Sequence, residues 1–152
     1  FRSYEAQMKF LLQVQGKFNE VIKGIKDIRQ AKSQMSDFIA KQGKACPAEV
    51  KQMADSLSKA LTAIEEKLHQ TKAKSGQDVL NFPIRLDDKL GGVFDMASSG
   101  NMAPAKQSVA VYNELAAQAD VELAKIKAII AEGLKAFNKL VREKELPVVV
   151  IK

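Results

Sequence analysis

The sequence predicts an all-α protein, an elongated antiparallel bundle in which three long helical segments, here called limbs, lie side by side. Apolar residues recur every three or four positions over two long stretches, one at each end of the chain, and residues at that spacing share one helix face. The composition favours helix, because alanine, lysine, leucine and glutamine are abundant among the 152 residues. Tryptophan is absent and only 6% of residues are aromatic, which disfavours a β-sandwich.

The first limb is predicted to run from the first residues to about Ile39 or Lys41, where Gly43 ends the helix. Gly16 and Gly24 lie inside it, and a glycine there costs roughly 1 kcal/mol relative to alanine. We therefore expect a neighbouring helix to approach these glycines closely. The apolar stripe of this limb is Tyr4, Met8, Leu11, Val14, Phe18, Val21, Ile25, Ile28, Met35 and Phe38.

The middle limb is predicted to contain two helices, broken near Phe82-Pro83. The first helix begins at Pro47, a residue whose fixed φ suits the first helical turn, and the second runs from about Ile84 to Ser98. Together they are about as long as the first limb, although a compact arrangement with the second helix folded back remains an alternative. The stripes are Val50, Met53, Leu57, Leu61, Ile64 and Leu68, then Ile84, Leu86, Leu90, Val93, Phe94 and Ala97.

The last limb is predicted to begin at Pro104 and to end at about Arg142 or Lys144, followed by a short β-prone tail over residues 146–151. At a rise of 1.5 Å per residue, a limb of about 40 residues spans roughly 60 Å. We predict one helical-bundle domain over residues 1–152 with four helices. The last stripe is Tyr112, Leu115, Ala119, Leu123, Ile126, Ile130, Leu134, Phe137 and Val141.

The net charge of +6 lies entirely in residues 1–76, which hold 14 basic and 8 acidic side chains. Lys23, Lys26, Arg29 and Lys32 occupy successive helical turns, a pattern that phosphate binding could use. The excess is mostly lysine, acids interrupt it, and no aromatic residues alternate with it for base stacking. We therefore expect a solvated helix surface here rather than a nucleic-acid site.

The segment lengths and the single cysteine exclude other classes. No stretch approaches the roughly 20 apolar residues that span a bilayer, so no membrane span is predicted. Cys46 is the only cysteine, which excludes an intrachain disulfide and predicts a free thiol. The chain begins at Phe1 rather than Met, and Tyr4 already lies in helical register. We expect a piece of a longer precursor.

Residues with possible chemistry do not combine into a predicted site. Glu66 and His69 match the Glu-x-x-His pattern of helical di-iron proteins, but that site needs the motif twice and this chain has one histidine. We expect a surface histidine at the end of a helix. Asp87 and Asp88 are adjacent, and adjacent helical residues diverge by about 100°. Together with Asp95 they are predicted to be structural or solvated, which includes pairing with Arg85 or Lys89.

Nucleophilic catalysis requires a nucleophile, a base and an orienting group in contact. Ser98, Ser99 and Ser108 have no histidine near them in sequence, and Gly91-Gly92 lacks the strand-to-helix setting of a phosphate-binding loop. We therefore predict no catalytic, cofactor-binding or metal-binding residue, no cofactor, and no enzymatic activity for this chain.

A resemblance adds to this interpretation. Residues 80–90 (LNFPIRLDDKL), then Ser98-Ser99-Gly100-Asn101 and Ala103-Pro104, together with Phe137-Asn138 and Leu146-Pro147, resemble the C-terminal helical region of large bacterial sortilin-like, BNR-repeat β-propeller proteins. The likeness is best over about residues 79–147, and such proteins are often named glycosyl-hydrolase-like. It implies an exported bacterial parent and a periplasmic or extracellular location. It assigns no site residue, because the propellers lie outside this chain.

The predicted function is a non-catalytic helical structural or interaction module, the C-terminal part of a larger exported bacterial β-propeller protein. The expected partners, bound through helix faces, are the parent's own β-propeller domains, another protein, or a second copy of this chain in a homo-oligomer. If the limbs leave apolar side chains uncovered, a partner should cover them. One alternative is an accessory segment of a glycoside hydrolase whose active site lies in the absent propellers. Another is a basic nucleic-acid-binding helical domain.

Overall fold

The computed structural model describes residues 2–69, 85–99 and 104–151, and it confirms the predicted all-α bundle. No β-strand occurs in these three ranges. The chain begins with the 41-residue helix α1 and a short 3₁₀ turn, η1, and a π-helical segment, η3, separates the last two helices. The elements are α1 (Arg2–Gln42), η1 (Gly43–Ala45), α2 (Ala48–Leu68), α3 (Leu86–Ser98), α4 (Lys106–Ala128), η3 (Ile129–Gly133) and α5 (Leu134–Glu143).

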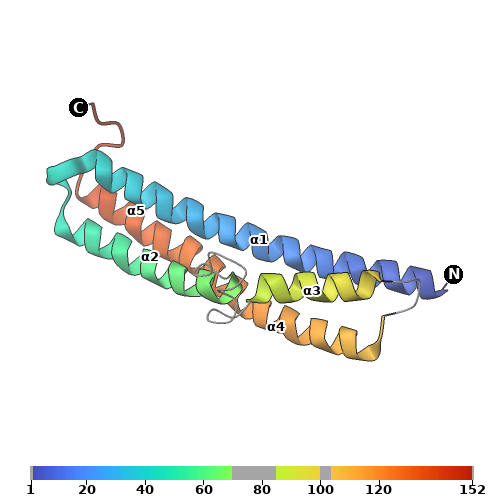
Figure 1. Ribbon diagram of the computed structural model, residues 1–152. Coiled ribbons are helices and arrows are strands. Elements are labelled where there is room, and N and C mark those ends of the chain that lie inside the picture. The colour runs from blue at the N-terminus through green and yellow to red at the C-terminus, as the bar shows by residue number, and fades with distance from the viewer. Residues whose placement is uncertain (1, 70–84, 100–103, 152) are drawn as a thin grey trace, which may run out of the picture.

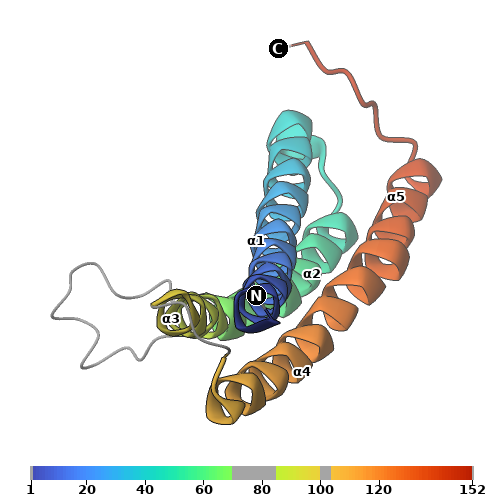
Figure 2. The same ribbon diagram turned by 90° about the vertical axis from the view of Figure 1, so that its right-hand side faces the viewer.

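The helices form three limbs that run up, down and up along one long axis (Figure 1). Helix α1 is the first limb, α2 and then α3 return along it, and α4, η3 and α5 run back as one limb. Figure 2 shows the bundle from its N-terminal end, with α1 between α3 and the last limb. The predicted break near Phe82-Pro83 lies outside the described residues. Its flanks agree with the prediction, because α2 ends at Leu68 and α3 begins at Leu86.

Local sequence accounts for the helix ends. Gly43 takes a positive φ of 58°, which glycine adopts without steric cost, and Pro47 is the extended residue that precedes α2. Helix α5 ends in a Schellman motif: the Glu145 amide donates to the Arg142 carbonyl and the Leu146 amide to the Val141 carbonyl. Glu145 holds the left-handed position there with φ of 54°, where glycine is the usual residue.

The predicted stripes form one continuous core. Its largest fully buried side chains are Val14, Val21, Ile28, Val50, Leu61, Leu68 and Leu90. Two edge-to-face ring pairs tie the first and last limbs together, Phe10 with Tyr112 and Phe38 with Phe137. The core therefore runs along the length of the bundle.

The first turns of α1 differ from the prediction. Tyr4 and Met8, predicted as part of the buried stripe, are exposed, while Gln7 and Phe10 face the bundle instead. The Gln7 amide nitrogen donates to the Ala97 carbonyl at 2.9 Å, so a hydrogen bond to the end of α3 orients this part of the helix. Gln7, a polar residue, occupies a buried position in this turn and sets the rotation of the helix about its axis. Apolar periodicity alone therefore predicts the wrong buried face here.

The last limb also differs from the prediction, because η3 interrupts an otherwise regular helix. A Cβ on Gly133 would lie 2.6 Å from Leu57 Cδ2, so α2 packs directly against the backbone there. The predicted close approach is confirmed at Gly24, where a Cβ would lie 2.9 Å from Leu123 Cδ2. It is wrong at Gly16, where a Cβ would meet nothing within 4 Å.

Candidate functional site

Buried charges gather at mid-length, where α2 ends and α3 begins. Glu65 on α2, Asp87 on α3 and Glu122 on α4 are each buried, although carboxylates almost never are unless they are paired. We call this region the charged junction. It is the part of the described chain in which catalytic or metal-binding chemistry would be sought first.

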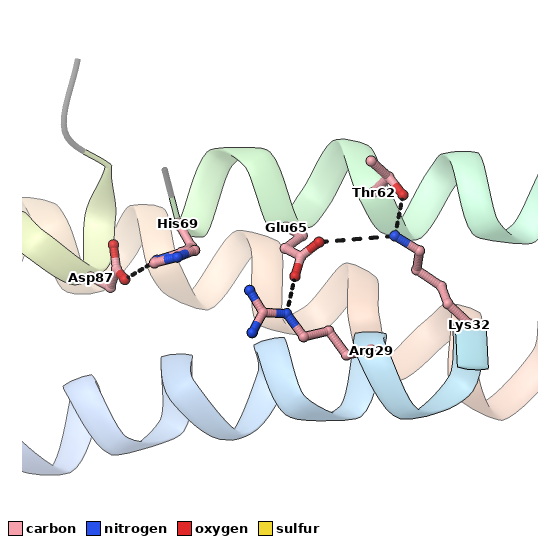
Figure 3. A network of polar contacts seen from close by, with 6 residues as sticks. All are labelled: Arg29, Lys32, Thr62, Glu65, His69 and Asp87. Carbon is pink, nitrogen blue, oxygen red and sulfur yellow. Dashed lines mark hydrogen bonds and ion pairs between the residues drawn. The ribbon is translucent and has the colours of Figure 1, made fainter. Parts of the chain in front are cut away.

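The first contact of the charged junction joins α1 to α2 (Figure 3). Arg29 Nε donates to Glu65 Oε1 at 2.6 Å, and Lys32 Nζ lies 4.0 Å from the other oxygen, Oε2. Lys32 Nζ also donates to the Thr62 hydroxyl at 2.7 Å. One buried carboxylate is thus balanced by two cations from the neighbouring helix, an arrangement that holds α1 against α2.

The second contact joins the ends of α2 and α3. His69 Nδ1 lies 2.6 Å from Asp87 Oδ2, and the Asp88 backbone amide donates to Asp87 Oδ1 at 2.8 Å. His69 lies at the C-terminal end of α2 with its side chain 37% exposed, and in addition it contacts a buried carboxylate from another helix. The side-chain partner of Asp87 is His69, whereas the sequence predicts Arg85 or Lys89 as partners for the acidic residues of this helix. Burial and the Asp87 charge raise the pKa of Asp88, and His69 partly offsets that rise.

A cleft of about 350 Å³ opens beside these pairs. Its walls are Lys67, Arg85, Leu86, Lys89, Gln118, Val121 and Glu122. Glu122 Oε1 lies 3.2 Å from Lys125 Nζ and 3.6 Å from Lys67 Nζ, while its Oε2 is buried without a hydrogen-bond partner in the described part of the chain. The cations on the walls suit an anionic group better than a cation.

The charged junction holds a histidine–carboxylate pair, and the described residues that line the cleft add no nucleophile to it. Hydrolysis by such a pair needs a nucleophile within hydrogen-bond reach of the imidazole. The cleft walls just described contain no serine, threonine or cysteine, and Cys46 lies buried beside Pro47 at the start of α2. Over residues 2–69, 85–99 and 104–151, no group of three or more histidine, cysteine, aspartate or glutamate side chains could hold a metal ion.

Several basic residues of α1 lie beside acidic side chains within the bundle. Lys23 Nζ lies 3.0 Å from Asp27 Oδ2, and the pairs of Arg29 and Lys32 with Glu65 are described above. Three of the four cations that occupy successive turns therefore already have acidic neighbours. A duplex or single strand would have to compete with these pairs, which weakens the case for a phosphate-binding stripe.

Two apolar surfaces are left uncovered. Tyr4, Met8 and Leu12 lie four residues apart on one side of α1, with Tyr4 57% and Leu12 61% exposed; we call this set the N-terminal stripe. At the opposite end, a groove of about 440 Å³ separates the last turns of α1 from α5. We call it the C-terminal groove, and its apolar walls are Ala31, Met35, Phe38, Leu134, Phe137, Val141 and Val148.

Comparison of the chain with protein-family models, with curated proteins and with solved structures found no match. Within the described ranges, no helix combines the length and the apolar character needed to cross a bilayer.

Proposed function

We propose that this chain is a non-catalytic helical module that packs through exposed helix faces onto another folded unit. The observation that supports the proposal most directly is the N-terminal stripe. Its three large apolar side chains, Tyr4, Met8 and Leu12, are spaced at i, i+4 and i+8 and so form a contiguous strip along one helix face. Such a strip differs from the single exposed apolar residues that are common on protein surfaces.

The unit that covers the stripe is proposed to be a β-propeller of the same polypeptide, in an exported bacterial protein. This part rests on the resemblance of residues 79–147 described above. The role of the chain would then be structural: a rod of roughly 60 Å that holds or spaces the parent's other domains. The alternative is an accessory role in a glycoside hydrolase. In that case the chain has the same structural role, and the propellers of the parent carry the active site.

Hydrogen exchange over residues 4–12 tests the proposal, with the chain 1–152 alone compared with the longer polypeptide that contains it. We expect slower exchange in the longer polypeptide, because a covering domain removes these turns from water. The double variant Met8→Glu/Leu12→Glu should abolish that difference. Gln30→Glu, an exposed change on the same helix, is the matched control and should preserve it. Equal exchange in the two unsubstituted polypeptides would contradict the proposal.

The hydrolase alternative is tested by assaying the longer polypeptide for glycan turnover with and without residues 1–152. An accessory role predicts turnover that falls in step with thermal stability when the segment is removed. A helical module in a non-enzymatic parent predicts no turnover in either form.

A further inference from the structure

The cleft at the charged junction takes its walls from α2, α3 and α4, which meet at the middle of the bundle (Figure 1). Its volume of about 350 Å³ falls within the range of small-molecule sites, roughly 300–1,000 Å³. The described walls carry three cations, Lys67, Arg85 and Lys89, and one carboxylate, Glu122. The cations and the carboxylate can recognise two different groups of one ligand.

Two of the cations are available to an anion. Arg85 and Lys89 form no ion pair with the residues that the structure describes, whereas Lys67 and Lys125 both lie beside Glu122. An unpaired guanidinium and an unpaired ammonium, four positions apart at the start of α3, form a pair of donors for a carboxylate or a phosphate. The anionic group of a ligand therefore belongs at this end of the cleft.

The first turn of α3 favours the same group. Leu86, the first residue of the helix, lines the cleft, so the positive end of the helix dipole lies beside the bound anion. Asp87 and Asp88 occupy the same turn, but neither is a wall of the cleft. The Asp87 carboxylate is already engaged by His69 and by the Asp88 amide.

Glu122 requires a hydrogen-bond donor on the ligand. Its side chain is only 9% exposed, and an ionised carboxylate has about four acceptor sites. Among the described residues it accepts one hydrogen bond, from Lys125 to Oε1 at 3.2 Å, and Oε2 is buried without a partner. Rotation about χ3, a torsion with a broad and roughly two-fold profile, turns this oxygen toward the cleft. The donor must be neutral, because Lys67 and Lys125 repel a second ammonium group.

We propose that the cleft binds a small anion that also carries a hydroxyl group, either a hydroxycarboxylate or the phosphate ester of a polyol. The anionic group lies against Arg85 and Lys89, and the hydroxyl group donates to Glu122. This inference does not depend on the proposed function, because the N-terminal stripe lies at one end of the bundle and the cleft at its middle (Figure 1).

Two matched pairs of probes test the proposal. Malate differs from succinate, and glycerol phosphate from propyl phosphate, only in hydroxyl groups. Each probe is titrated into the isotope-labelled chain 1–152 at about 0.1 M ionic strength, which screens non-specific attraction, and binding is followed by nuclear magnetic resonance. The side-chain amide of Gln118, on the cleft wall, is the local reporter.

We expect a dissociation constant on the order of 1 mM for the hydroxylated member of one pair. Its partner without hydroxyl groups should bind at least about fivefold more weakly, because the hydrogen bond to a charged acceptor is lost. The pair that shows this preference identifies the anionic group as a carboxylate or a phosphate. No shift of the Gln118 amide up to about 50 mM of any probe, or equal binding within both pairs, would overturn the proposal.

Variants assign the two ends of the ligand. Glu122→Gln should remove most of the preference for the hydroxyl group without weakening the probe that lacks it, because a neutral amide is a weaker acceptor. Lys89→Gln should weaken both members of the pair. Lys51→Gln, the same change of charge at an exposed site on α2 outside the cleft, is the matched control and should weaken neither.

Lys89 is exposed, so its variant should fold even if Glu122→Gln does not, and circular dichroism establishes the fold of each variant. An unchanged hydroxyl preference in folded Glu122→Gln contradicts the assignment. So does equal weakening by Lys51→Gln and Lys89→Gln, because it indicates general attraction of anions to the net charge of +6.

Discussion

The two glycines inside α1 allow the packing of the first and last limbs to be tested with the same substitution in the same helix. Gly16→Ala adds a methyl group where nothing lies within 4 Å. Gly24→Ala adds one 2.9 Å from Leu123 Cδ2 and 3.1 Å from Ile126 Cδ1. Both changes raise helix propensity equally, so the difference between them isolates the contact with α4.

The expected magnitudes follow from these distances. In the middle of a helix, alanine is favoured over glycine by about 1 kcal/mol, and Gly16→Ala should raise the free energy of unfolding by that amount. At Gly24 the same gain is opposed by overpacking, which typically costs about 1–3 kcal/mol. The crowded atoms are the ends of two side chains, and Ile126 is buried and has little freedom to move. We expect Gly24→Ala to lie between neutral and about 2 kcal/mol destabilising.

Urea unfolding followed by circular dichroism at 222 nm measures both variants. The urea midpoint of Gly16→Ala should rise and that of Gly24→Ala should stay unchanged or fall, with the slope m unchanged because the surface exposed on unfolding is the same. Their thermal midpoints should differ by several degrees, since about 1 kcal/mol shifts a domain of this size by roughly 2–4 °C. If Gly24→Ala stabilises the protein as much as Gly16→Ala does, α4 does not approach α1 as described.

Three further predictions concern single contacts. Glu145→Gly should stabilise the fold by about 1 kcal/mol, because φ of 54° is strained for glutamate and free for glycine; the urea midpoint measures it. Arg29→Ala should lower the free energy of unfolding by about 2 kcal/mol, because it leaves the buried Glu65 carboxylate without its closest partner, whereas Glu65→Leu should lower it clearly less. The urea midpoints of the two variants, measured under identical conditions, test this order. Burial raises the pKa of Tyr112 above its ordinary value of 10.0, so the stabilisation that comes from keeping this tyrosine neutral is complete below pH 10 and is lost as pH rises through the folded-state pKa. The free energy of unfolding, measured between about pH 8 and 12, should therefore fall less steeply in Tyr112→Phe than in the unsubstituted chain.

Periodicity was sufficient to predict the three limbs, their order and most of the core, because burial of one stripe per helix is what stabilises long helices. It misplaced Tyr4 and Met8 because Gln7, a polar residue, makes the contact that orients the first turns. It also missed η3, the segment in which Gly133 lies against Leu57 of a limb that is distant in sequence. Both differences occur where a residue of another helix makes contact, and the apolar pattern of one helix does not show which residues of other helices it will contact.

The pairing of His69 with Asp87 was unpredictable for a related reason. Neither residue belongs to a motif that specifies the other, and they approach only because α3 follows α2 along α1. The same holds for Glu65, which the sequence does not distinguish from Glu66 beside it. Position on the helix decides between them: Glu65 is buried against α1 beside Ile64, while Glu66 lies toward the surface.

The location of the buried charges indicates what they contribute to the fold. An apolar stripe looks much the same from one helical turn to the next. If one limb slid along another by one turn, about 5.4 Å, many apolar contacts would form again. The same shift would separate Glu65 from Arg29 and Asp87 from His69, leaving carboxylates buried without partners at a cost of several kcal/mol. We infer that the charged junction specifies the register of the limbs. That register fixes where the N-terminal stripe and the C-terminal groove lie relative to each other, which is what the proposed packing onto another folded unit would require.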